Sequence, residues 1–162
     1  MIYGVNSGMK SDYERAMNQA MYYLGSRART VRQVEEYLTK KEHDEHTIAQ
    51  VMEKLIEYKL LDDEAYARRY IETRKSTSGK YLLRQKMKQQ GLDEDTIAEA
   101  IEEIPFEEQV EAAKSLLEKK LAHDEREDAL RRAVQSVMRR GFSYDAVRAA
   151  ADRYKEELQW ED

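Results

Sequence analysis

The sequence lacks cysteine altogether and has one proline, six glycines, two phenylalanines and one tryptophan among its 162 residues. Without cysteine, a disulfide framework, a thiolate zinc site and thiol catalysis are excluded, which fits a reducing cytosol. No apolar run approaches the roughly 20 residues that span a bilayer, and residues 1–10 show no signal-peptide pattern. We therefore expect a soluble, cytoplasmic protein.

Large apolar residues are also scarce, because Leu, Ile, Val and Phe account for only 30 of the 162 residues. Disordered chains share this fraction when their net charge is high, but here 33 acidic and 28 basic residues leave a net charge of −5. Eleven tyrosines and seven methionines add surface that can be buried. We expect a folded protein without one thick central core.

The residues that are abundant favour helix. Ala, Glu, Lys, Arg and Gln have high helix propensity, and apolar residues follow the helical period, as at Tyr13, Met17, Ala20 and Leu24. No segment alternates in the manner of a strand. The sequence predicts an all-α fold.

A repeat of 49 to 50 residues runs through the chain. Leu38, Met87 and Val137 begin three similar segments, and ten residues later each segment has a branched apolar residue. Four residues before that residue stands a good helix N-cap, which is Asp44, Asp93 or Ser143.

The turns before these N-caps differ in one position. Gly91 and Gly141 occupy it in two segments, where a helix would end in the left-handed conformation that glycine adopts easily. Glu42 stands there in the first segment. We expect the first turn to differ from the others or to be strained.

Each segment is expected to hold three helices. The expected ranges are 12–26, 30–41 and 44–59, then 62–76, 79–90 and 93–104, then 105–121, 125–140 and 143–158. One three-helix repeat has too few large aliphatic residues to bury a core alone, so repeats must stack. The predicted fold is three tandem three-helix repeats in an elongated, curved array, with repeats at 11–60, 61–104 and 105–162 after a flexible N-terminal segment at 1–10.

Charge is distributed unevenly along the chain. Eight basic residues and one acid lie between Arg68 and Lys88, whereas nine acids and no base lie between Asp93 and Glu111. On a helical wheel Arg68 and Arg69 lie opposite the apolar side of helix 62–76, and Lys80, Arg84 and Lys88 form a stripe along helix 79–90. Such faces can hold a polyanion or an acidic partner, although solvated charge runs are common.

Other binding modes fit less well. Helix–turn–helix reading of DNA would place acids such as Glu94, Glu99, Glu102 and Glu103 against phosphates, so we do not expect it. Tyr66 and Tyr70 have the helical spacing of core residues, whereas Tyr22, Tyr23 and Tyr81 remain open between a core position and stacking on single-stranded bases.

No motif for catalysis or cofactor binding is present. Gly79-Lys80 lacks the other elements of a phosphate-binding loop, and no Gly-x-Ser-x-Gly elbow occurs. His43 and His46 have possible metal-ligand spacing, but they fall at an expected turn, and we interpret them, like His123, as hydrated loop residues. We expect a binding protein that is not an enzyme and has no cofactor or metal.

Several segments resemble one known family. Leu60–Ile71 reads LLDDEAYARRYI and is followed by Gly79, Arg84 and Gln90–Leu92 (QGL). This order resembles the signature region of the bacterial RecX family of recombination regulators. The first repeat and the end of the chain are also similar to that family, through Tyr23, Leu24, Arg27, Arg29, Thr30, Val34, Tyr37 and Leu38, and through Arg140–Tyr144.

Two positions depart from the pattern of that family. Arg84–Met87 (RQKM) carries a base where the family often has an acid, and Glu42 replaces the usual turn glycine. Some members also have a longer N-terminal region than residues 1–10 provide.

The resemblance implies tandem three-helix repeats and a role in recombinational DNA repair. It implies a protein that binds the RecA recombinase, lies in the groove of its filament on single-stranded DNA and restrains its recombinase and ATPase activities. We expect a monomer with no membrane partner. The expected filament-facing surface consists of Arg27, Arg29, Arg68, Arg69, Arg74, Lys75, Lys80, Arg84 and Lys88.

Two other functions remain open from the residues alone. A stand-alone single-stranded nucleic-acid binder would bind DNA without recombinase and with strong salt dependence. A helical-repeat scaffold would bind an unrelated protein and ignore both DNA and recombinase.

Overall fold

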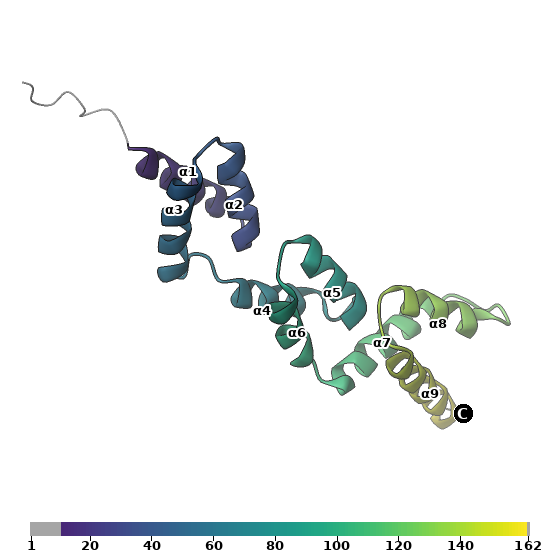
Figure 1. Cartoon of the computed structure of the whole chain (residues 1–162). Helices are drawn as coiled ribbons and strands as arrows, with labels where there is room; N and C mark the ends of the chain where they lie inside the picture. The colour runs from purple at the N-terminus through teal and green to yellow at the C-terminus, as the bar shows by residue number, and fades with distance from the viewer. Residues whose placement is uncertain (1–10, 162) are drawn as a thin grey trace, which may run out of the picture. The chain divides into compact units, whose positions relative to one another are not determined.

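The computed structural model describes residues 11–161, which form nine helices and no strand within that range (Figure 1). The predicted N-terminal segment, residues 1–10, lies outside the described residues. The helices are α1 (Asp12–Ser26), α2 (Val31–Lys40), α3 (Glu45–Glu57), α4 (Asp63–Arg74), α5 (Lys80–Gln89), α6 (Glu94–Glu102), α7 (Phe106–Leu121), α8 (Ala129–Arg139) and α9 (Tyr144–Trp160). The all-α prediction is confirmed, and no described helix is both long and apolar enough to cross a bilayer.

The helix starts follow from local side-chain chemistry. Asp44, Asp93 and Ser143 are extended residues whose side chains accept a backbone N–H from the first turn of α3, α6 and α9. Thr30 does the same for α2 within a complete capping box, in which Oε1 of Gln33 accepts a hydrogen bond from the Thr30 N–H. These bonds satisfy backbone donors that a helix leaves unpaired at its start.

Contacts divide the chain into two units, which are described separately. The first unit ends at Tyr66 and also includes Gln90–Leu92. The second unit comprises Ala67–Gln89 and the chain from Asp93 onward.

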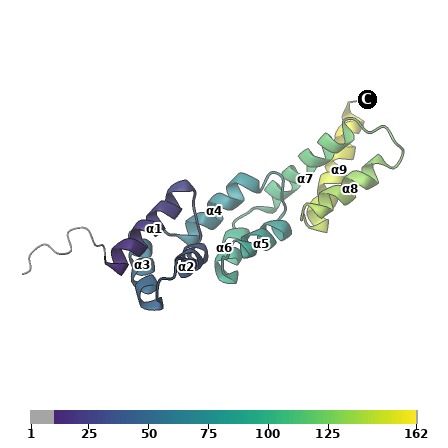
Figure 2. The same cartoon turned by 90° about the horizontal axis from the view of Figure 1, so that it is seen from above.

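The core of the first unit lies between α1, α2 and α3 (Figure 2). Ala16 and Ala20 on α1 are fully buried and allow the helix to approach closely. They pack with large apolar side chains, which are Val34, Leu38, Val51, Met52, Leu55 and Leu61. The predicted helical period therefore corresponds to the buried side of each helix.

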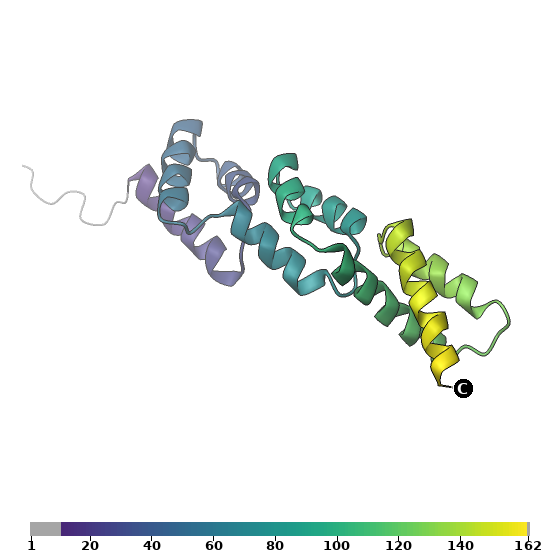
Figure 3. The same ribbon diagram turned by 90° about the horizontal axis from the view of Figure 1, so that it is seen from below.

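The last three helices form the main core of the second unit, and Figure 3 shows them side by side. Val110, Ala113 and Leu117 of α7 are fully buried against α8 and α9. The remaining buried members are mostly small, namely Ala133, Val137, Phe142, Ala146, Val147, Ala150 and Ala151. Small residues explain how a chain with few large apolar residues still closes a core.

In the first unit, the start of α2 contacts the turn at residues 90–92. The Thr30 hydroxyl is fully buried and donates to the Gln90 carbonyl at 2.7 Å. The Val31 N–H donates to Oδ1 of Asp63, the first residue of α4, at 3.0 Å. A Cβ added at Gly91 would lie 2.9 Å from the Arg32 side chain.

In the second unit, the start of α5 makes the same kind of contact with the turn between α8 and α9. The Gly79 N–H donates to the Arg140 carbonyl at 2.8 Å, and the Tyr81 N–H donates to the Gly141 carbonyl at 3.1 Å. The Lys80 N–H donates to Oε1 of Gln109 on α7 at 3.3 Å. Gly79 and Gly141 permit this approach, because a Cβ at either residue would lie within 2.4 Å of backbone atoms.

All three turns share one backbone conformation. Glu42 has φ 66°, Gly91 has φ 96° and Gly141 has φ 90°. The first turn was expected to differ from the others or to be strained. It has the same left-handed conformation and is strained, because a positive φ is costly for a residue with a Cβ.

Candidate partner-binding surface

Helix α4 separates apolar from basic residues. Ala67, Tyr70 and Ile71 are buried, while Arg68 and Arg69 are exposed on the other side. Within residues 11–161, neither arginine has an ion-pair or hydrogen-bond partner for its guanidinium. Both charges are therefore available to a partner.

Helix α5 continues the pattern in the second unit. Leu83 and Met87 are buried, whereas Lys80 and Arg84 reach the surface and have no carboxylate partner among the described residues. Lys88 pairs with Glu94 at 3.1 Å, but both side chains stay more than half exposed. An exposed pair of this kind contributes little, so Lys88 can exchange it for another anion.

Lys75 is already neutralised within the second unit. Its Nζ lies 3.0 Å from Glu108 of α7 and 3.0 Å from Glu72 of α4. The hydrogen bonds that Lys75 donates to Glu108 and Glu72 raise the pKa of Lys75 above its ordinary value. This lysine connects α4 to α7 and is the least available of the predicted surface residues.

Arg74 and Arg29 stack on tyrosines of their own helices or flanking turns. The Arg74 guanidinium lies 3.8 Å from the centre of the Tyr70 ring, and that of Arg29 lies 3.9 Å from the centre of Tyr23. Arg29 is half-buried, and its Nη2 donates to Ser26 at 3.2 Å. Stacked arginines of this kind support the fold as well as carrying charge.

Arg27, like Arg29, belongs to the first unit. It follows α1 in an extended conformation and is exposed. The nine predicted surface residues thus fall into two sets. Arg27, Arg68, Arg69, Lys80 and Arg84 are unpaired among the described residues, while the other four are stacked or paired.

The acidic stretch is partly neutralised inside the second unit. Arg153 of α9 pairs with Glu107 and Glu111 of α7, and hydrogen bonding to Arg153 lowers the pKa of Glu107. Asp93 is a helix cap whose pKa is lowered by the Thr96 N–H. Glu99, Glu102 and the C-cap residue Glu103 are exposed and unpaired among the described residues, so the unpaired acids of this stretch lie on α6 and at its end.

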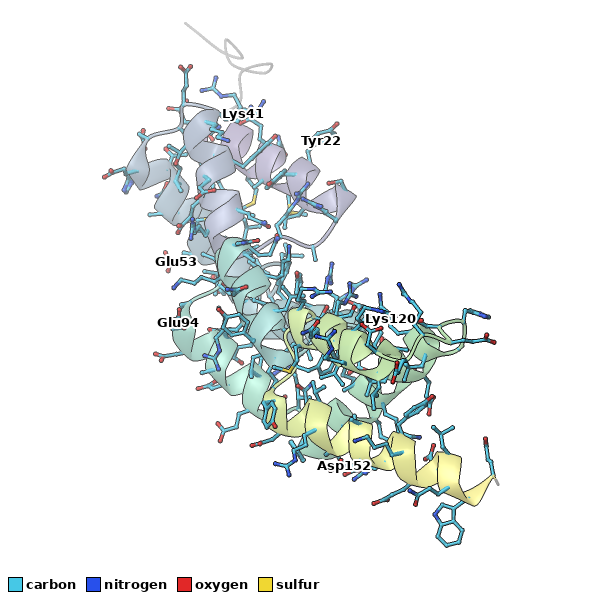
Figure 4. The ribbon with its side chains drawn as sticks, turned by 90° about the vertical axis from the view of Figure 1, so that its right-hand side faces the viewer. Tyr22, Lys41, Glu53, Glu94, Lys120 and Asp152 are labelled. Carbon is cyan, nitrogen blue, oxygen red and sulfur yellow. The ribbon has the colours of Figure 1, made fainter. Side chains whose placement is uncertain are left out.

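The structure also shows the positions of the tyrosines for which the sequence left two roles open, a core position or stacking on bases. Tyr22 is 82% exposed and projects from α1 (Figure 4), and Tyr81 is 65% exposed on α5. Tyr23 instead stacks on Tyr37, with ring centres 4.1 Å apart. Tyr70 is buried, in agreement with its predicted core position, and Tyr66 is half-buried.

The histidine cluster has a structural partner. Nε2 of His43 lies 2.6 Å from Oε1 of Gln19 and forms a hydrogen bond across the first unit. Within residues 11–161, no group of three or more His, Asp or Glu side chains is arranged to hold a metal ion.

Sequence reasoning missed one feature of the second unit, which is a hollow beside Lys80 and Arg84. Exposed apolar side chains from three other segments line it, namely Phe106, Met138 and Tyr144. These residues are widely separated along the chain. No local pattern in the sequence could have brought them together.

Comparison with known families identifies the chain. Models of the first, second and third three-helix domains of RecX match residues 16–55, 62–101 and 107–150. The chain belongs to the RecX family. The three tandem three-helix repeats predicted from the sequence are confirmed by the order of these domains.

Curated RecX proteins are similar over most of this chain. Regulatory protein RecX of Bacillus subtilis (strain 168) is 35% identical over 151 residues, which cover 90% of this chain and 57% of the relative. Regulatory protein RecX of Geobacillus thermodenitrificans is 37% identical over 139 residues, which cover 83% of this chain and 52% of the relative. The chain therefore spans little more than half the length of these regulatory proteins.

Solved RecX structures share the fold. The crystal structure of RecX from Lactobacillus salivarius has a TM-score of 0.82 and 28% identity, and the match covers 89% of this chain and 97% of that chain. A second crystal structure, of regulatory protein RecX, has a TM-score of 0.74 and 26% identity, with 87% of this chain and 72% of that chain covered. The second of these structures, like the curated relatives, is named as a regulatory protein.

Proposed function

We propose that this member of the RecX family binds the RecA recombinase on single-stranded DNA as a monomer and restrains its recombinase and ATPase activities. Family membership supports a regulatory role. The unpaired cations Arg68, Arg69, Lys80 and Arg84 of α4 and α5 are the observation that carries the proposal, because they offer a basic surface to a polyanionic or acidic partner.

The available cations define the expected contact. Lys75, Arg74 and Arg29 already have partners within the fold, so their contribution should be smaller. The acids of α6 would be unfavourable beside phosphates, and this side of the protein should face away from DNA.

The test is the single-strand-dependent ATPase of RecA, measured with and without the full chain. The wild-type protein should lower the rate. Reversing Arg68, Arg69, Lys80 and Arg84 together to Glu should raise the concentration needed for half inhibition by about tenfold or more.

A matched variant controls for net charge. Lys40, Lys119, Lys120 and Lys155 are exposed and have no ion-pair partner within residues 11–161, so their reversal to Glu changes charge equally. This variant should inhibit like the wild type. Equal inhibition by both variants would show that the α4–α5 surface is not the contact.

Binding to DNA alone separates the alternatives. A stand-alone nucleic-acid binder should retain single strands without recombinase, with log affinity falling by about 0.7 per phosphate contact as log salt rises. A protein that bound neither DNA nor recombinase would be a scaffold for some other partner, and the proposal would be wrong.

A further inference from the structure

The hollow in the second unit has a volume of about 570 Å³ and lies where α5 meets the turn between α8 and α9. Ile101 and Phe142 form an apolar floor and are only 4% and 2% exposed. Around it stand Tyr81, Phe106 and Tyr144, which are 65%, 52% and 64% exposed. Exposed aromatic side chains gathered at a concave apolar surface are typical of binding sites.

Backbone hydrogen bonds hold the segments that line this hollow together in the absence of a ligand. The Gly79 and Tyr81 N–H groups donate to the carbonyls of Arg140 and Gly141, and these bonds hold α5 against the turn. The Gln109 side chain accepts from the Lys80 N–H at the same place. A preformed site binds at lower entropic cost than one that must first be ordered.

The lining also includes one buried polar side chain, that of Gln109. Gln109 is 3% exposed, and its Nε2 has no partner among the described residues. Its Oε1 accepts the Lys80 N–H, so the side chain holds the start of α5 in place. Because Nε2 is closed off from solvent, a ligand in the hollow would contact the other lining residues and not this amide.

The charged residues that line the hollow favour a ligand with negative charge. Lys80 and Arg84, one helical turn apart on α5, line the hollow and have no carboxylate partner in residues 11–161. The described lining residues include no Asp or Glu. The rim is therefore cationic while the interior is apolar.

We propose that this hollow binds an acidic segment of a partner protein through one aromatic or long aliphatic side chain. The apolar group would enter between Phe106, Met138 and Tyr144, and flanking carboxylates would pair with Lys80 and Arg84. A peptide fits better than a nucleic acid, because the interior offers little hydrogen bonding for the edges of a base and two cations cannot track a phosphate backbone. The inference rests on the proposed function only in expecting a protein partner.

The test uses the full chain and a synthetic peptide in which one Phe is flanked by Asp and Glu. Titration should shift the methyl resonances of Met138 and Ile101 in NMR spectra and leave Met52 of the first unit unchanged. Phe106→Ala and Arg84→Glu should each weaken binding by about tenfold. Tyr22→Ala removes an aromatic residue of the first unit that is even more exposed than Phe106, and it should have no effect.

Two further probes decide the nature of the ligand. A peptide with Ser in place of Phe should bind at least about tenfold more weakly, and equal binding would reduce the site to charge alone and overturn the proposal. Short oligothymidylate should not shift Met138. If it did so while the Phe peptide did not, the hollow would be a nucleic-acid site.

The outcome for the hollow is separable from the proposed function. If wild-type protein inhibited the recombinase ATPase but no acidic peptide shifted Met138 or Ile101, the hollow proposal alone would fail. If the peptide bound as expected while the recombinase was unaffected, the partner would be another acidic protein and the proposed function would fail.

Discussion

The turn at Glu42 and the turns at Gly91 and Gly141 have the same left-handed backbone but different surroundings. A Cβ at Gly141 would meet the backbone N of Leu82 at 2.4 Å, and one at Gly91 would meet the Arg32 side chain at 2.9 Å. Glu42 carries its side chain on the surface. The comparison shows that left-handed φ alone does not exclude a side chain, and that at Gly141 the backbone of α5 adds a packing requirement that is weaker at Gly91.

The two glycine turns also accept their hydrogen bonds from different kinds of donor. At the first, the Thr30 hydroxyl reaches the Gln90 carbonyl. At the second, Gly79 stands at the place of Thr30, and its backbone N–H makes the bond to the corresponding carbonyl of Arg140. Losing the side chain at residue 79 allows two backbones to touch, so this turn should tolerate change least.

Gly141→Ala should therefore have the largest effect of four substitutions. A left-handed alanine costs about 1–2 kcal/mol, and overpacking against fixed backbone adds about 1–3 kcal/mol. We expect a loss of about 3 kcal/mol in the free energy of unfolding, measured by urea denaturation. Gly25→Ala is the control, because nothing lies within 4 Å of its Cβ position, and a loss at Gly141 no larger than at Gly25 would refute the packing argument.

Gly91→Ala should cost less, although its φ is similar. Here the new Cβ meets a side chain that can move rather than backbone, so we expect about 1–2 kcal/mol, mainly from the left-handed conformation. The double variant Arg32→Ala, Gly91→Ala removes the side chain that the new Cβ would meet. It should regain only the part of the unfolding free energy that this contact costs. A cost as large as that of Gly141→Ala would mean that the two turns are equally tight.

Thr30→Ala tests the contact in which a side chain, the Thr30 hydroxyl, donates to the Gln90 carbonyl. The substitution removes both the helix cap and the bond to Gln90, and each is worth about 1 kcal/mol. Ser143→Ala removes a cap alone at an exposed position and should cost about half as much. Equal losses of unfolding free energy in the two variants would show that the bond to Gln90 adds nothing.

Glu42→Gly should have the smallest effect and the opposite sign. Relief of the left-handed strain at φ 66° exceeds the greater entropy of glycine in the unfolded chain, so we expect a gain of about 0.5 kcal/mol. Lys59→Gly, at φ 57°, should give a similar gain in the same urea measurement. A clear loss at residue 42 would indicate that the Glu42 side chain stabilises the first turn.

The positions of the helices were largely predictable because their signals are local. Predicted and observed ends of α1 coincide, and Asp44, Asp93 and Ser143 cap the helices expected of them. The start of α8 was expected at residue 125 but lies at Ala129. Asp124 accepts hydrogen bonds from both Arg126 and Arg132, and this cluster holds the preceding residues in a turn.

The candidate surface was predictable only as a set of charges. The excess of bases between residues 68 and 88 is visible in the sequence, but their partners are not. The ion pair between Lys75 and Glu108 joins residues far apart in the chain. The hollow beside Lys80 likewise depends on Phe106, Met138 and Tyr144. The spacing of residues in the sequence does not indicate that these three lie close together.

The sequence by itself determined the helices, their caps and the threefold repeat, because each depends on propensity and spacing within a few residues. Tertiary structure alone decided which charges remain free, where an apolar hollow opens and why Gly79 and Gly141 cannot carry a side chain. Those outcomes depend on distances between atoms that are remote in the chain, such as the 2.8 Å bond from Gly79 to Arg140. Only packing sets such distances.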